Sequence, residues 1–309
     1  MPLTAGPRIA ALLGGAVGLV WLLACLALWG LQEHLIFFPD PRVLTATGPF
    51  RPVTIGPGLV ALATPTASGG PTADGAVLLY LHGNGGNAAD RAGLLRPLAE
   101  AGHGVLIAGY RGYGGNPGRP TQAGLEEDAE TQLGWLRRAW PGRPVVLVGE
   151  SLGTYLAMWL AAAHPDAVAG VVLDAPFTSL RELAGERFPL VPVRLLLRHP
   201  FDTLALAPRV AAPVRVLHGA GDGLIPPAMG ARVAAAVPNP AGFTLVEGAG
   251  HPVGGQGGVM AMRQAIAAML AGAPESDGAE GDGTGAHEVG GHEVGDHGTG
   301  ARGPWQDHR

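Results

Sequence analysis

The sequence contains no lysine, and its single cysteine is Cys25. Without lysine the chain cannot form a nucleotide-binding P-loop, whose lysine reaches the β- and γ-phosphates. A single cysteine excludes an internal disulfide and a metal site built from several thiolates. The formal net charge is −5, yet residues 274–309 alone carry −6, which leaves +1 for the rest of the chain. Because nucleic acid is bound through basic surfaces, this near-neutral remainder predicts no nucleic-acid partner.

Formal charge is absent from residues 9–32, which are mostly Leu, Ala, Val, Gly and Trp. These 24 residues exceed the roughly 20 that a helix needs to cross a bilayer core. A cleaved signal peptide has an apolar region of about 7–15 residues and an A-x-A-like site, and neither fits. A lipoprotein-type cleavage before Cys25 is opposed by the apolar residues that continue to Leu31. The pattern favours a retained transmembrane anchor over residues 1–33.

The flanks of this run predict its orientation. Arg8 precedes it, whereas Glu33 and Asp40 follow it. By the positive-inside rule, we expect a single-pass membrane protein whose remaining chain lies on the extracytoplasmic side.

From residue 77 onward, apolar runs of strand length alternate with longer segments of helical spacing. This alternation predicts βαβ units, and the continuously apolar strands indicate a sheet covered on both faces. The Pro- and Gly-rich stretch that precedes it, up to Asp74, favours short antiparallel strands. We therefore predict an α/β domain over residues 34–271, with a mostly parallel sheet and helices on both faces. The predicted strands are 77–81, 105–108, 145–148, 171–173, 214–217 and 244–246, and two of the predicted helices are 125–140 and 152–163.

Two segments break the alternation. Residues 176–213 contain Phe188-Pro189-Leu190-Val191-Pro192 and a Leu-rich turn, which favours a lid or small cap. Residues 272–309 hold almost no large apolar side chain, so they cannot offset the entropy of ordering, and we predict a disordered tail. Its histidines, His287, His292 and His297, could hold Zn²⁺ or Ni²⁺ weakly beside carboxylates. The composition favours a solvated tail without a metal site.

The motif Gly149-Glu150-Ser151-Leu152-Gly153 lies between a predicted strand and a predicted helix. It matches the G-x-S-x-G nucleophile elbow in the strand–turn–helix context that this motif requires. Glycines two residues before and after the serine are needed because the sharp turn brings neighbouring backbones too close for a Cβ. The motif predicts Ser151 as a nucleophile, held clear of the sheet at the positive end of a helix.

A serine nucleophile needs a base within hydrogen-bond reach, and the base needs a carboxylate to hold its tautomer. In this architecture the acid and the histidine follow the serine in that chain order, each after a later strand. We therefore predict Asp222 as the acid and His251 as the general base. Asp174, at the end of the preceding strand, is the rival acid. The alternatives are that Asp222 is only a turn residue and that His251 is structural.

The loop that follows strand 77–81 is the candidate oxyanion loop, His82-Gly83-Asn84-Gly85-Gly86-Asn87. Backbone N–H donors aimed at a developing oxyanion are worth about 2.7–4 kcal/mol each. We expect these donors to be the amides of Asn84 and Leu152. His82 is expected to brace the loop rather than to titrate in catalysis.

Five motifs occur in a fixed order: Leu81-His82-Gly83-Asn84-Gly85-Gly86-Asn87, Tyr110-Arg111-Gly112-Tyr113-Gly114, Gly149-Glu150-Ser151-Leu152-Gly153, Asp174-Ala175-Pro176-Phe177 and Gly248-Ala249-Gly250-His251. Together they resemble the N-terminally membrane-anchored branch of the α/β-hydrolase superfamily, which includes esterases and acyl-protein thioesterases. The resemblance covers residues 31–270 and implies ester or thioester hydrolysis without a cofactor. The family often has Asn-Asp after the catalytic histidine, whereas Pro252 and several glycines follow His251 here.

The motifs predict a serine hydrolase that works through a Ser-His-Asp triad and a covalent acyl-enzyme. The anchor and the short lid favour an acyl or lipid-like substrate near the bilayer. A peptidase or amidase on the same triad is the alternative, because pocket shape decides the leaving group. A catalytically inactive, membrane-tethered binding protein is the alternative from another class, and the intact elbow, acid and histidine disfavour it. Dehalogenase and epoxide-hydrolase chemistry is disfavoured because the elbow nucleophile of those enzymes is aspartate.

Overall fold

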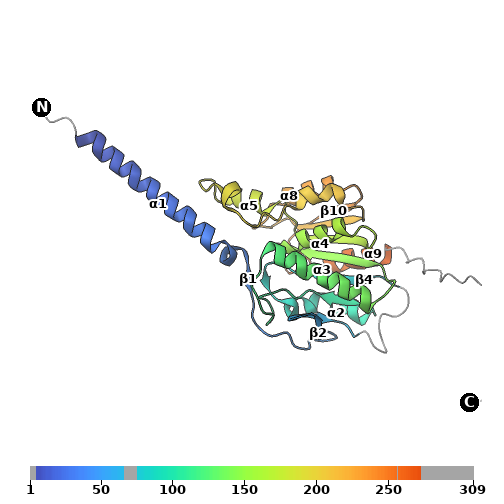
Figure 1. The fold of residues 1–309 in the computed structure, drawn as a ribbon. Coiled ribbons are helices and arrows are strands. Elements are labelled where there is room, and N and C mark those ends of the chain that lie inside the picture. The colour runs from blue at the N-terminus through green and yellow to red at the C-terminus, as the bar shows by residue number, and fades with distance from the viewer. Residues whose placement is uncertain (1–4, 66–74, 256, 273–309) are drawn as a thin grey trace, which may run out of the picture. The chain divides into compact units, whose positions relative to one another are not determined.

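The computed structural model describes residues 5–65, 75–255 and 257–272. The strands of its main sheet are β2 (Arg51–Gly56), β3 (Leu59–Ala63), β4 (Val77–Leu81), β6 (Val105–Ile107), β7 (Val145–Glu150), β8 (Val168–Asp174), β9 (Val214–Gly219) and β10 (Pro240–Val246). They form an eight-stranded sheet in the order β10-β9-β8-β7-β4-β6-β3-β2 (Figure 1). Neighbours from β10 to β6 are parallel, while β3 is antiparallel to both β6 and β2. The predicted mostly parallel sheet, preceded by short antiparallel strands, is confirmed.

Helices cover both faces of this sheet (Figure 1). Those on one face, which share one buried apolar cluster, are α3 (Gln122–Ala139), α4 (Leu152–Ala163) and α8 (Pro227–Ala236). Those on the other face, which share a second cluster, are α2 (Ala92–Glu100) and α9 (Val259–Gly272). Because both faces are covered, every residue of β4 is fully buried, which explains its continuously apolar sequence.

Strand β4 and helix α4 have the predicted bounds, and β6 ends one residue earlier than predicted, but several other elements begin before the predicted apolar runs. Helix α3 begins at Gln122 rather than at residue 125, because Thr121 Oγ1 caps it by accepting a hydrogen bond from the Gly124 N–H at 3.1 Å. Strand β8 begins at Val168, which already pairs with Val145 of β7. The apolar pattern thus marks the buried part of each element, while caps and ladder pairing set its ends.

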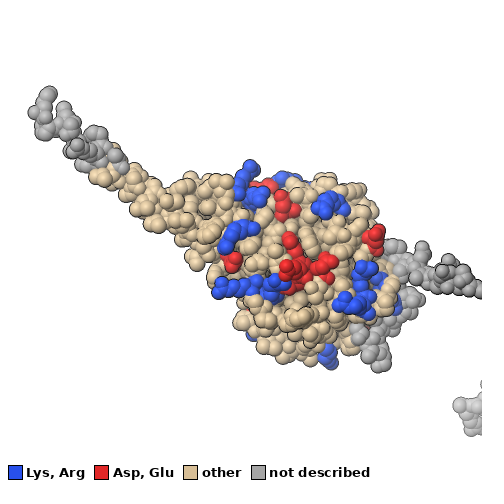
Figure 2. Space-filling view, in the orientation of Figure 1, with Lys and Arg blue, Asp and Glu red and all other residues tan. Residues whose placement is uncertain are grey.

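The N-terminal apolar run forms helix α1 (Ala5–Ile36). Its segment Leu12–Ile36 has 25 residues, and an 18-residue window of that segment has a mean hydropathy of 2.2 with 6% of the window buried in the protein. At 1.5 Å per residue, this segment is about 37 Å long, which exceeds the roughly 30 Å of a hydrocarbon core. Figure 2 shows no charged side chain on most of the described length of α1, while arginine and acidic side chains are interspersed on the visible face of the domain. By length and composition, α1 can cross a membrane.

Residues 176–213, the predicted lid or cap region, contain three short helices: α5 (Leu180–Arg187), α6 (Val193–Leu196) and α7 (Thr203–Leu206). Helix α5 has no buried residue, whereas Phe201 and Val210, further along the chain, are fully buried in the cluster that contains α4. We call residues 180–198 the lid segment. The predicted tail and its histidines lie, after Gly272, outside the described residues.

Candidate active site

Ser151 lies at the turn between β7 and α4, with φ +51° and ψ −116°. Residues other than glycine rarely adopt this left-handed region, and such strain is typical of a nucleophile elbow. A Cβ on Gly153 would lie 2.0 Å from the Leu81 carbonyl oxygen, and one on Gly149 would lie 2.6 Å from the Thr154 Cα. Both glycines are therefore required by the close approach of the backbones, as the motif predicts.

The side chains of Ser151, His251 and Asp222 form one hydrogen-bonded chain. His251 Nε2 lies 2.9 Å from Ser151 Oγ, and His251 Nδ1 lies 2.8 Å from Asp222 Oδ2. Since a carboxylate only accepts, Nδ1 donates to Asp222, and the neutral imidazole keeps Nε2 free to accept from the serine hydroxyl. The structure thus brings the three predicted triad residues within hydrogen-bond reach of one another.

Asp174, the rival acid, is bonded to the main chain after His251, whereas the His251 side chain is bonded to Asp222. Its carboxylate oxygens accept hydrogen bonds from the main-chain N–H groups of Val253 at 2.8 Å and Gly254 at 2.9 Å. Asp174 therefore holds the loop that follows His251. This anchoring explains how His251 reaches the serine although Pro252 replaces the sequence that the family often has there.

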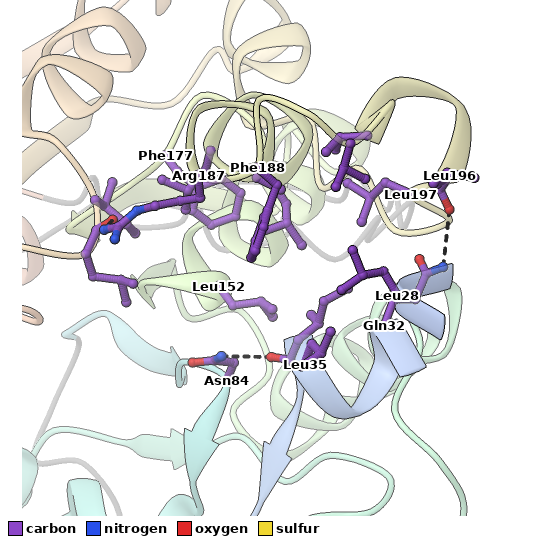
Figure 3. Close-up of a pocket in the computed structure, with 18 of the residues that line it drawn as sticks. Leu28, Gln32, Leu35, Asn84, Leu152, Phe177, Arg187, Phe188, Leu196 and Leu197 are labelled. Atoms are coloured by element: carbon purple, nitrogen blue, oxygen red, sulfur yellow. Dashed lines mark hydrogen bonds between the residues drawn. The ribbon is translucent and has the colours of Figure 1, made fainter. Parts of the chain in front are cut away.

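The two residues predicted to stabilise an oxyanion, Asn84 and Leu152, line the same cavity as Ser151. Leu152 is the first residue of α4, and the first N–H groups of a helix have no partner within it. Asn84 is held by the segment where α1 ends. Its carbonyl accepts from the Phe38 N–H, just after α1, at 3.0 Å, and its side-chain Nδ2 donates to the Ile36 carbonyl at 2.8 Å (Figure 3). The Tyr113 hydroxyl also donates to the Asn84 carbonyl at 2.8 Å. Here β1 (Phe38–Pro39) pairs in parallel with β5 (Gly85–Gly86).

Beside Ser151 lies a cavity of about 510 Å³, a usual size for a small-molecule site. Its walls come from α1, the lid segment and the loop after β9, and most of its lining side chains are apolar (Figure 3). Its polar lining residues are Gln32, Asn84, Ser151 and Arg187. Within residues 5–65, 75–255 and 257–272, no group of three or more His, Cys, Asp or Glu side chains is placed to hold a metal ion.

Known proteins are similar to this chain in sequence and in fold. The alpha/beta hydrolase fold family matches residues 76–197. An uncharacterized protein of Mycobacterium tuberculosis is 36% identical over 234 residues, which cover 72% of this chain and 82% of that protein. The chain belongs to the α/β-hydrolase family.

Two further proteins to which this α/β-hydrolase is similar are a lipase and an esterase. The lysophosphatidylserine lipase ABHD12 of Mus musculus is 30% identical over 176 residues, which cover 49% of this chain and 42% of that protein. A Pyrococcus furiosus esterase superposes with a TM-score of 0.59 at 18% identity, covering 76% of this chain and 98% of that one. The structural likeness shows the fold, and family membership supports a hydrolase.

His218, a fully buried histidine beside Asp222, was not predicted as a site residue from the sequence. Its Nε2 lies 3.3 Å from Asp222 Oδ2 and 3.0 Å from the Ile225 carbonyl oxygen. Burial alone would raise the pKa of Asp222, but hydrogen bonds from His218, His251 and the Ile225 N–H hold that pKa well below its usual range. Asp222 is therefore ionised at neutral pH. The available signal was a histidine near the end of an apolar strand, four residues before the predicted acid.

The ion pair between Arg91 and Glu150, next to the nucleophile elbow, was also not predicted from the sequence. The Glu150 carboxylate lies 2.5 and 3.1 Å from the Arg91 guanidinium, and it accepts from the Tyr80 hydroxyl at 2.8 Å and more distantly from the Gly83 N–H at 3.4 Å. Although burial raises the pKa of Glu150, pairing with Arg91 holds it below its usual value. The available signal was a glutamate at the end of an apolar strand, since a buried charge requires a partner.

His82, in the oxyanion loop, is fully buried and fits the bracing role expected of it. Its Nδ1 lies 2.7 Å from the Gly83 carbonyl oxygen, to which it donates. Burial, assisted by the charge of Arg91, lowers the pKa of His82 to about 4. The His82 ring is therefore neutral at neutral pH.

Burial raises the pKa of Asp174 to about 7, against the effect of its two N–H donors. Between its ordinary pKa and this value, the folded chain holds a proton that the unfolded chain has lost. The free energy of unfolding of the wild type should therefore fall relative to that of Asp174→Asn as the pH rises from about 5 to 7, by up to about 1.4 kcal/mol per pH unit. Urea unfolding of the detergent-solubilised chain, followed at several pH values, measures this difference. Parallel pH profiles would contradict a protonated Asp174.

Proposed function

We propose that this α/β-hydrolase cleaves carboxylic ester or thioester bonds, with Ser151 as nucleophile, His251 as general base and Asp222 as the acid that orients the histidine. His251 takes the proton of Ser151 Oγ as that oxygen attacks the substrate carbonyl. It then returns the proton to the leaving alcohol or thiol, which leaves an acyl group on the serine. Water, activated by the same histidine, releases the acid. The observation that carries the proposal is the hydrogen-bonded chain of 2.9 and 2.8 Å through these three side chains.

The negative oxygen of each tetrahedral intermediate is proposed to lie between the N–H groups of Asn84 and Leu152. No cofactor takes part in this chemistry, because nucleophile, base and oxyanion donors all come from the chain. Asp222 stays ionised throughout, in keeping with the direction of its pKa.

The proposed substrate is an acyl or lipid-like ester near a membrane. Three observations support it: the cavity beside Ser151 is mostly apolar, α1 can span a bilayer, and a relative is named a lysophosphatidylserine lipase. We further propose that α1 is a retained single-pass anchor and that the catalytic domain lies on the extracytoplasmic side, since Arg8 precedes the apolar run and Glu33 follows it.

Labelling with a fluorophosphonate probe tests the covalent mechanism. The full-length protein should be labelled, and the label should be lost in Ser151→Ala and in His251→Ala, because the probe needs an activated serine. His164→Ala is the matched control, since His164 is paired with Glu130 on α3 and lies outside the site. Labelling that persists in Ser151→Ala would place the nucleophile elsewhere. A wild type that neither labels nor hydrolyses would favour the inactive binding protein.

A series of p-nitrophenyl esters and acyl thioesters of increasing chain length tests the substrate class. The value of kcat/KM should rise with chain length, because each buried methylene contributes about 0.8 kcal/mol. Equal rates at all lengths would remove the lipid-like substrate from the proposal. Hydrolysis of peptide anilides as fast as that of the esters would instead support the peptidase alternative.

A further inference from the structure

The cavity beside Ser151 is built partly from the apolar helix α1. Five of its lining residues belong to α1: Leu28, Trp29, Gln32, Leu35 and Ile36. Their spacing of three and four residues places them on one face of the helix. In Figure 3, Leu28 and Leu35 lie across the cavity from Phe188 and Leu197 of the lid segment, with Leu152 beside the cavity floor. The cavity is therefore not complete within the hydrolase domain alone.

Polar contacts fix which face of α1 meets the lid segment. The Gln32 side chain is 6% exposed; its Nε2 donates to the Leu196 carbonyl at 3.2 Å, and its Oε1 accepts from the Arg198 N–H at 2.8 Å. A buried amide is costly unless it is paired, so these bonds favour one rotation of the helix. The Arg198 guanidinium also lies 5.2 Å from the centre of the Trp29 ring and 3.4 Å from Glu33.

We infer that α1 is a wall of the acyl-binding pocket as well as an anchor, and that Leu28 helps to set the length of the acyl chain that the enzyme accepts. This inference rests on the proposed function and names specificity-determining residues for it. Leu28 is half-buried and points into the cavity, so its size limits the space available beyond the ester carbonyl. The ligand that fits this space is a single, unbranched acyl chain held between α1 and the lid segment.

The test is a comparison of Leu28→Trp with Leu31→Trp in the full-length, detergent-solubilised protein. Leu31 carries the same side chain on α1, but it is 55% exposed and does not line the cavity. In Leu28→Trp, kcat/KM for p-nitrophenyl decanoate should fall about tenfold or more, because the larger ring fills space that the chain needs. The fall in kcat/KM for p-nitrophenyl acetate should be several-fold smaller than that for the decanoate, because the short acyl chain needs less of the space that the ring fills. Leu31→Trp should behave as the wild type with both esters.

Leu28→Ala gives a second, independent test, because it enlarges the cavity and should move the preferred chain length upward. The inference is overturned if Leu28→Trp and Leu28→Ala keep the wild-type chain-length profile while Ser151 is still labelled by the fluorophosphonate probe. In that case the proposed function stands. If the wild type itself is neither labelled nor active on any ester, the proposed function fails, and this inference fails with it.

Discussion

In Ser151→Ala and in His251→Ala, kcat/KM for ester hydrolysis should fall by about 10⁴- to 10⁶-fold, and the double variant should fall no further. The reason is that serine and histidine act through one proton transfer, so that removing either side chain removes the whole step. Their 2.9 Å separation is the distance that this transfer requires. Steady-state kinetics on the best ester of the chain-length series measures the three values.

His164→Ala is the control for removing a histidine outside the site, and its kcat/KM should equal that of the wild type. The residual activity of the three variants should be similar, since it comes from substrate binding and the oxyanion donors alone. A double variant whose loss equals the product of the two single losses would mean that Ser151 and His251 act independently. That result would contradict the proton transfer between them.

In Arg91→Met, the free energy of unfolding should fall by about 3–5 kcal/mol, because Glu150 is left as an unpaired buried charge. The side chains of Arg91 and Glu150 are only 15% and 6% exposed. The double variant Arg91→Met, Glu150→Gln should recover much of this loss, since a neutral amide oxygen can still accept from the Tyr80 hydroxyl. Urea unfolding in detergent measures the three stabilities.

Arg96→Met is the matched control, because Arg96 pairs with Glu100 on the surface of α2. Exposed pairs at this spacing are worth about 0.3–0.5 kcal/mol. If Arg91→Met were no more destabilising than Arg96→Met, the pair beneath the elbow would be solvated. The Gly83 N–H donates to the Glu150 carboxylate and so links this pair to the oxyanion loop. We therefore expect Arg91→Met to lose kcat as well as stability.

The parts of the molecule that could be predicted from the sequence are those encoded locally. Strand β4 is apolar at every position because it is buried on both faces. The two glycines of the elbow, the strand before it and the helix after it are all contiguous in the sequence. Asp222 could be preferred to Asp174 because the strand before Asp222 immediately precedes the strand before His251, as the order of a triad requires. Each of these inferences needs only neighbouring residues and one topological rule.

The remaining features depend on contacts between distant segments. Arg91 and Glu150 are 59 positions apart, and Gln32 and Arg198 are 166 apart, so no periodicity joins them. The apolar run of α1 predicts a membrane helix from composition, and composition does not tell which face of that helix meets the lid segment. Likewise, the sequence after His251 departs from the family pattern, and only the folded chain brings Asp174 to the N–H groups of Val253 and Gly254.

The short parallel pair of β1 and β5 makes the setting of Asn84 depend on the segment that leaves α1. Strand β1 belongs to the segment that leaves α1, whereas its partner borders Asn84. A cut after Pro41 would release a domain that lacks both the Phe38 N–H and the Ile36 carbonyl, while Asn84 would keep the hydrogen bond from the Tyr113 hydroxyl to its carbonyl. If Asn84 is the oxyanion donor proposed above, a released domain that keeps full activity has to carry Ile36 and Phe38 with it.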